Sequence, residues 1–336
     1  MKINEKISQY RDIRKQVWFD ATKVQVTTVE EHLQNQHLFQ NFVTGLCSRC
    51  QLKVHSGTDE ESAKVLWHKM WTVIRYAGIR SNIATNEILS IQDVFDNYQE
   101  FLSLDWNIEK HGSKLLFGGN KAIQLRDRTG LFEDKKPIAN WSKNQRTVSL
   151  ARNFNEFMKN KVESTSVIDF ITGGMNVDNI WGILEHLQLI NYKQRITALH
   201  LMMDLGFQTV KPDIVLSRIF MELGWTKDVI LDLPSDITIE DLSGKGKYGG
   251  KYHYTNPKMY KPVIELARTL VKQINKDDLK ADIGWVTDNP IREFDFFIVK
   301  FGQEPEPSRG IVKKLFNTGT YQCVDKVKQQ SSRACR

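Results

Sequence analysis

Hydrophobic residues recur at helical spacing along most of the chain. The stretches with this periodicity are 29–46, 60–78, 91–98, 147–160, 166–224 and about 257–275. In the first stretch the spaced residues are Leu33, His37, Leu38 and Phe42, and we expect Gly45 to end that helix. In the second stretch they are Val65, Leu66, Met70, Trp71, Ile74 and Tyr76. The pattern predicts a mainly α fold.

Two glycine-containing stretches interrupt the helical pattern. Residues 111–145 combine glycine turns, a proline and short apolar pieces, which are typical of either a β-hairpin or an irregular lobe. Residues 234–256 are rich in glycine, lysine and tyrosine. We expect a helical N-terminal extension over 1–146, a functional domain over 147–303 and a loosely ordered tail over 304–336.

Composition narrows the class of protein. The 336 residues are 40% hydrophobic and 26% charged, which are ordinary values for a globular protein. Lysine and arginine (47) exceed aspartate and glutamate (40), an excess that permits binding to a polyanion without requiring it. The four cysteines do not suggest a disulfide framework, and we find neither a secretory signal nor a membrane span. We therefore expect a cytoplasmic protein, without a membrane association, that acts as a monomer.

Residues 197–224 have the pattern helix, loop, helix. The first helix is predicted from Thr197 to Leu205 and stops at Gly206. The second begins after Pro212 and Asp213, so Asp213 is expected at or beside its N-cap. Its buried stripe is predicted to be Val215, Leu216, Ile219, Phe220 and Leu223.

A carboxylate at a helix N-terminus has a possible chemical use. Unpaired backbone amides and the helix dipole favour its ionised form. An ionised carboxylate stabilises the oxocarbenium-like state through which an N-glycosidic bond breaks. Aspartate is also among the commonest N-caps, so a purely structural role for Asp213 is the alternative reading of this residue alone.

The whole of residues 182–224 resembles the signature of the helix-hairpin-helix DNA glycosylases. In that family a hairpin of the type Leu-Pro-Gly-Ile-Gly-x-x-Thr-Ala is followed by a helix, a loop, and a Pro-Asp that opens the next helix. Here Ile190–Ala198 takes the place of the hairpin, Pro212–Asp213 matches the catalytic corner, and Arg218 matches a basic residue one turn later. The resemblance implies that Asp213 is the catalytic carboxylate.

The sequence also departs from the family pattern. Tyr192 and Gln194 stand where the family has the two glycines that let the backbone approach a DNA phosphate. Ile196 stands where members that also nick DNA carry a Schiff-base lysine, which implies a monofunctional enzyme. Lys193 lies three residues earlier, so a lysine nucleophile stays open. The iron–sulfur cysteines of some members are absent, and we expect neither a cofactor nor a metal.

Candidate DNA contacts lie in three places. The hairpin and the following helices supply Lys193, Gln194, Arg195, Thr197 and Arg218. The loop 244–254 supplies Lys245, Lys247 and Lys251, interleaved with Tyr248, Tyr252 and Tyr254 that could stack on a base. The alternatives are a solvated turn for the hairpin residues, a surface ion pair for Arg218, and a flexible loop, made mobile by its glycines, for 244–254.

Two further groups of residues are candidates for a binding site. Trp71 and Trp181 are candidates for a pocket that receives an extruded base, with a place in the core as the alternative. Cys47 and Cys50, flanked by His37 and His55, have the spacing of half a zinc site, but no second half follows. Unpaired cysteines are the favoured interpretation.

The sequence as a whole predicts a monofunctional DNA glycosylase. It would hydrolyse the N-glycosidic bond of a damaged or modified base in double-stranded DNA, with the base extruded, and leave an abasic site. The large N-terminal extension suggests a specialised base, such as a bulky modification in foreign DNA. The alternatives are a non-catalytic helix-hairpin-helix DNA-binding protein and a helical interaction protein.

Overall fold

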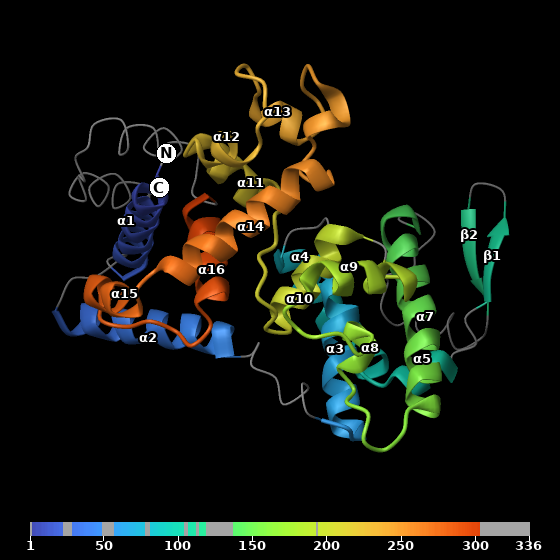
Figure 1. The fold of residues 1–336 in the computed structure, drawn as a ribbon. Coiled ribbons are helices and arrows are strands. Elements are labelled where there is room, and N and C mark those ends of the chain that lie inside the picture. Colours follow the sequence, from blue (N-terminus) through green and yellow to red (C-terminus); the bar gives the residue numbers. More distant parts are fainter. Residues whose placement is uncertain are drawn as a thin grey trace, which may run out of the picture. The chain divides into compact units, whose positions relative to one another are not determined.

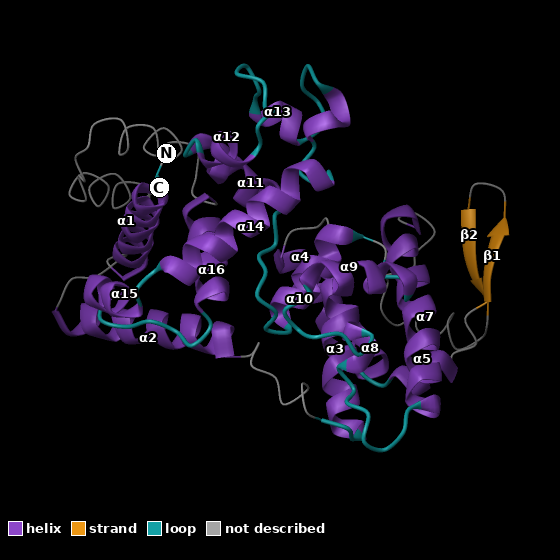
Figure 2. Cartoon of the chain, in the orientation of Figure 1, coloured by secondary structure: helices purple, strands orange, loops and turns teal. Residues whose placement is uncertain are grey.

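The computed structural model describes residues 2–22, 29–48, 57–77, 81–103, 107–111, 114–118, 137–192 and 194–302. Within these ranges the chain is mainly helical, which confirms the predicted class (Figures 1 and 2). The chain forms two compact units. We call them the terminal unit, formed by the described residues of 1–51 and 208–336, and the middle unit, formed by those of 52–207.

The terminal unit is built around its last helix. Its helices are α1 (Ile3–Thr22), α2 (Val29–Ser48), α11 (Ile214–Glu222), α12 (Trp225–Val229), α13 (Ile239–Leu242), the short 3-10 helix η2 (Gly249–Tyr252), α14 (Pro257–Gln273), α15 (Lys276–Ile283) and α16 (Pro290–Gly302). Helix α16 packs against α1, α2, α11 and α14. Phe294 of α16 stacks on Trp225 and meets the ring of Tyr10 at 4.7 Å, so residues from both ends of the sequence share one core.

The middle unit is a helical layer with one hairpin. Its elements are α3 (Glu60–Tyr76), α4 (Ser81–Phe95), α5 (Tyr98–Ser103), β1 (Asn107–His111), β2 (Lys114–Gly118), α7 (Pro137–Asn160), α8 (Asp169–Thr172), α9 (Ile180–Leu189) and α10 (Arg195–Asp204). The antiparallel strands pair Asn107 with Gly118 and His111 with Lys114. Trp67 stacks on Phe154 in a core of aromatic rings.

The two units differ from the predicted domains. The predicted boundary between 146 and 147 lies inside α7, which begins at Pro137 because a proline fits the first turn of a helix. Residues 1–51 belong to the terminal unit, so 1–146 is not a separate extension. The hairpin at 107–118 accounts for the start of the predicted lobe, and 119–136 and the tail at 304–336 lie outside the described residues.

Helix α2 differs from its prediction in its end and in its buried face. It continues through Gly45 to Ser48, because Gly45 keeps a helical backbone there. Leu33, Leu38 and Phe42 are more than half exposed, whereas Val43 and Cys47 are buried. In the part of the chain that the structure describes, no helix is long and apolar enough to cross a membrane.

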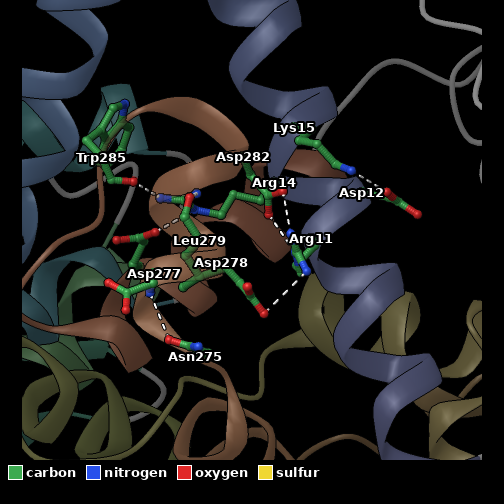
Figure 3. A network of polar contacts seen from close by, with 11 residues as sticks. Arg11, Asp12, Arg14, Lys15, Asn275, Asp277, Asp278, Leu279, Asp282 and Trp285 are labelled. Carbon is green, nitrogen blue, oxygen red and sulfur yellow. Dashed lines mark hydrogen bonds and ion pairs between the residues drawn. The ribbon is translucent and has the colours of Figure 1, made fainter.

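A buried arginine ties α1 to the C-terminal helices. Arg14 donates from Nε to Glu293 at 2.6 Å, from Nη1 to the Leu279 carbonyl at 2.5 Å and from Nη2 to the Trp285 carbonyl at 2.6 Å. Figure 3 shows Arg14 directed toward these carbonyls and Arg11, one turn earlier, directed toward α15. The guanidinium and Glu293 carboxylate are fully buried, so their geometry fixes how α1 meets α16.

Candidate active site

The end of α10 in the middle unit and the start of α11 in the terminal unit each form as the local sequence predicts. Gly206 has φ of 83°, a left-handed backbone that ends α10. The N–H of Gly206 donates to the Met203 carbonyl, and the N–H of Phe207 donates to the Met202 carbonyl. In the terminal unit, the corner at 211–213 leads into α11, and Asp213 caps this helix: Oδ1 accepts the N–H groups of Val215 at 3.0 Å and Leu216 at 3.1 Å. The predicted helix stop and N-cap are both confirmed.

The cap leaves one oxygen of Asp213 for other interactions. Because both helix amides bind Oδ1, the plane of the carboxylate is fixed. Oδ2 lies 3.6 Å from Nζ of Lys211, and the Asp213 side chain is 24% exposed. Asp213 is therefore an oriented anion that stays partly open to solvent.

A second carboxylate lies behind this corner. Asp295, on α16, is buried, accepts the backbone N–H of Lys211 at 3.2 Å, and pairs with Arg292 at 3.3 Å. Burial raises the pKa of Asp295 to about 6; Arg292 opposes this rise and the charge of Asp213 adds to it. The two carboxylates thus interact electrostatically while sharing Lys211.

Tyr254 is an aromatic residue in electrostatic range of Asp213. Burial raises the pKa of its hydroxyl, and the negative charge of Asp213 raises it further. The ring lies 4.6 Å from the ring of His253. The other two loop tyrosines are engaged within the loop region, because Tyr252 donates to the Asp232 carbonyl and Tyr248 to the Asp236 carboxylate.

The loop 244–254 is compact, in contrast to the mobile loop considered from the sequence. The buried carboxylate of Asp241 accepts the N–H groups of Thr238 and Tyr248 at 2.9 Å each. A Cβ added at Gly246 would lie 2.2 Å from Oδ1 of Asp241, so this glycine permits a close approach. The three lysines of this loop have different surroundings.

All three lysines of the loop are exposed, and Lys247 also forms an ion pair. Lys247 pairs with Asp236 at 2.8 Å, and the hydrogen bonds from Lys247 and Tyr248 lower the pKa of Asp236 to about 2. Lys251 lies over the ring of Tyr252, 5.1 Å from its centroid. Lys245 and Lys251 are thus better placed than Lys247 to meet a phosphate.

Arg218 is engaged inside the terminal unit. It donates to the carbonyl of Gly302 and lies 3.8 Å from Glu222, and its side chain is 12% exposed. The prediction of Arg218 as a DNA contact is therefore corrected. Its mostly buried guanidinium is bound to α16 and links two helices instead of facing a ligand.

The predicted hairpin is closed by residues other than glycine. Asn191 takes the left-handed backbone with φ of 71°, and the N–H of Tyr192 donates to the Leu187 carbonyl at 2.8 Å. Asparagine is one of the few residues other than glycine that tolerate this conformation. The ring of Tyr192 is buried and its hydroxyl donates to the Met70 carbonyl, so it fills the core of the middle unit.

The other hairpin residues divide into exposed and buried ones. Gln194 and Arg195 are exposed, as a DNA contact requires. Thr197 is buried and its hydroxyl donates to Oε1 of Gln194 at 3.1 Å, so it supports the turn and its prediction as a DNA contact is corrected. Lys193 lies outside the described residues.

Trp71 is a core residue. Its side chain is fully buried, and its indole N–H donates to Oδ1 of Asp96 at 3.0 Å. A ring without an exposed face cannot receive a base, so the prediction of Trp71 as a pocket residue is corrected.

Trp181, on α9, is partly exposed. Asp96 also contacts Nδ1 of His68 at 2.5 Å, a partner that the sequence did not identify.

The described residues contain no group of three or more His, Cys, Asp and Glu side chains suited to a metal ion. Cys47 is buried, and His37 is exposed. Cys50 and His55, which complete the sequence pattern, lie outside the described residues.

Sequence reasoning missed Lys211 and Asp295, and it named Tyr254 as a loop tyrosine without connecting it to Asp213. Lys211 directly precedes the predicted Pro212–Asp213 corner and could have been considered with it. Asp295 is 84 residues from its partner, and no local pattern connects them. Comparison of the chain with models of known protein families, with curated proteins and with solved structures found no match, so the site is interpreted from its own residues.

Proposed function

We propose that the chain is a monofunctional DNA glycosylase with Asp213 as its catalytic carboxylate. The observation that carries the proposal is the Asp213 side chain, which is oriented by two helix amides and is still partly exposed. The resemblance of residues 182–224 to the helix-hairpin-helix glycosylases supplies the class of reaction. The substrate is a damaged or modified base in double-stranded DNA, including bases of foreign DNA.

The reaction needs a fixed negative charge beside the sugar. As the bond from C1′ to the base nitrogen breaks, its electron pair leaves with the base and positive charge spreads over C1′ and the ring oxygen. The Asp213 carboxylate stabilises this charge and orients a water molecule toward C1′. The water oxygen bonds to C1′, and its proton passes through the carboxylate to the base nitrogen that took the electron pair, which gives a free base and an abasic site.

Exposed residues in each unit supply candidate DNA contacts. Lys245 and Lys251 of the terminal unit, and Gln194 and Arg195 of the middle unit, are exposed and suited to phosphate oxygens. Tyr254 is a candidate to pack against the sugar or base, because it lies in electrostatic range of Asp213.

Asp213→Asn tests the proposal. Asparagine is as good an N-cap as aspartate, so α11 keeps its cap while the charge is lost. On duplex oligonucleotides that carry different modified bases, we expect the native protein to leave alkali-labile abasic sites and the variant to act at least about 10²-fold more slowly. Asp59→Asn, at the N-cap of α3, is the matched control and should keep full activity.

Equal activity of the native protein and Asp213→Asn would overturn the assignment of Asp213. A mass-spectrometric screen of bases released from differently modified genomic DNAs identifies the substrate in the same series. It also reports activity on a base that the oligonucleotides do not contain.

The second candidate is a non-catalytic DNA-binding protein, and the closed hairpin favours it. Tyr192 fills the place of a family glycine with a buried ring, which removes the bare backbone that would approach a phosphate. This function predicts salt-dependent retention of duplex DNA with no released base. A protein that neither retains DNA nor releases a base is instead a helical interaction protein.

A further inference from the structure

We propose that Asp295 is a positioning residue for Asp213: its buried carboxylate holds the backbone at Lys211 and places a second negative charge behind the catalytic one. This inference rests on the proposed function and deepens it. It assigns to α16, at the far end of the sequence, a part in the chemistry of a corner that the sequence places at 211–213.

Two hydrogen bonds connect Asp295 with the cap of α11. Asp295 Oδ1 accepts the N–H of Lys211 at 3.2 Å, and the Lys211 carbonyl accepts the N–H of Asp213 at 2.7 Å. Lys211 also sends Nζ to within 3.6 Å of Asp213 Oδ2. A shift of Asp295 would therefore move both the backbone and the ammonium group that contact the proposed catalytic carboxylate.

Burial makes this contact rigid and electrostatically strong. Asp295 is buried on α16, where Arg292 on the same helix pairs with Oδ2 at 3.3 Å. From the segment packed against it, the charged groups that act on Asp295 are Asp213 and Lys211. Since little water screens these charges, ionisation of Asp295 changes the potential at Asp213.

The protonation state of Asp295 should then be visible in the reaction. Burial raises its pKa to about 6, so Asp295 is neutral well below this pH and ionised above it. The ionised form adds negative potential where a positive sugar develops. Base release should therefore accelerate as the pH rises through about 6.

The first experiment reads the contact without using catalysis. In the native protein, the ¹⁵N-labelled backbone amide of Lys211 should shift with pH with a midpoint of about 6. The midpoint should disappear in Asp295→Asn and rise in Arg292→Gln, which removes the paired cation. It should stay in Asp288→Asn, an exposed acid two residues before α16. An amide of Lys211 that does not titrate in the native protein would overturn the proposal.

The second experiment reads catalysis by single-turnover base release between pH 5 and pH 8, which is about the range over which such a group titrates. The native rate should rise through about 6. Asp295→Asn should lose this rise and be on the order of 10-fold slower at pH 8, because a negative charge that favours the positive sugar is lost. Arg292→Gln should move the rise to higher pH.

The outcomes separate the two proposals. If Asp213→Asn is inactive while Asp295→Asn keeps the native rate and pH profile, this inference is overturned and the proposed function stands. If the native protein releases no base, the proposed function fails, and the Lys211 amide titration alone decides whether Asp295 holds the corner.

Discussion

The segment 211–213 contains one carboxylate, that of Asp213, and is contacted by a second, that of Asp295. Their surroundings give them different properties. Asp213 is bound by helix amides and reaches solvent, whereas Asp295 is buried beside Arg292. A buried carboxylate costs stability when it is ionised, because the folded protein hydrates it poorly. At the scale of the residue, Asp295 should therefore weaken the fold at the pH where it supports the reaction.

This cost can be measured with Asp295→Asn. The folded-state pKa of about 6 lies above the ordinary aspartate pKa of 3.8, so the native state binds more protons between these values and its stability falls as pH rises through them. Above pH 6 the full penalty is present, roughly 3 kcal/mol for a pKa raised from 3.8 to about 6. Urea unfolding should show the variant more stable than the native protein at pH 8, with the difference vanishing near pH 4.

A difference of the same size at both pH values would contradict this account, because it would point to packing instead of ionisation. A gain in stability together with a slower reaction would be the trade-off expected of an active-site residue.

At the scale of elements, α11 is placed by its contact with the end of α16. Gly302 has no side chain at the point where α11 passes: a Cβ there would lie 2.7 Å from Ile219 Cγ1 and 2.8 Å from Val215 Cγ1. Arg218 of α11 donates to the carbonyl of the same glycine. The helix that Asp213 caps is thus packed closely on α16 along the face opposite to solvent.

Gly302→Ala should destabilise the protein by about 1–3 kcal/mol, because branched buried side chains must move to admit a methyl group. Gly45→Ala is the matched control. Gly45 also lies in a helix, but no atom is within 4 Å of an added Cβ, so alanine should stabilise α2 by up to about 1 kcal/mol. Thermal unfolding of both variants checks the opposite signs, and two losses of equal size would refute the close-packing account.

At the scale of the molecule, the described N-terminal and C-terminal segments form one unit through buried polar contacts. Arg14 satisfies Glu293 and two backbone carbonyls, and Glu293 in turn accepts the N–H of Thr287 at 2.7 Å. Figure 3 shows that α1 also directs Arg11 to Asp278 and Asp282. Breaking the buried pair would leave a charge without its partner inside the unit.

Arg14→Met should therefore lower the free energy of unfolding by about 3–5 kcal/mol. Lys15→Met, the neighbouring position, is the control: Lys15 forms a pair with Asp12 that is more than one third exposed and should cost under about 1 kcal/mol. The reactivity of the buried Cys47 thiol, followed by peptide mass spectrometry, reports opening of the terminal unit. A Cys47 thiol in Arg14→Met that stays as protected as in Lys15→Met would contradict this role.

The features that could be predicted from the sequence depend on neighbours along the chain. The stop at Gly206, the cap at Asp213 and the buried stripe at Leu216, Ile219 and Phe220 all formed as expected. Each depends on residues within about one or two helical turns, so a short stretch of sequence contains the whole physical cause.

Tertiary structure alone decided what surrounds these features. Asp295 binds Lys211, Arg218 binds Gly302, and Tyr192 reaches Met70, in each case across at least 84 residues. The predicted face of α2 was wrong because helical spacing shows which residues share a face but not which face meets the core, and Trp71 took its alternative place in the core instead of lining a pocket. The sequence by itself therefore determined that Asp213 heads a helix. Only the tertiary structure placed a second, buried carboxylate behind it, since burial and charge pairing arise from segments that are distant along the chain.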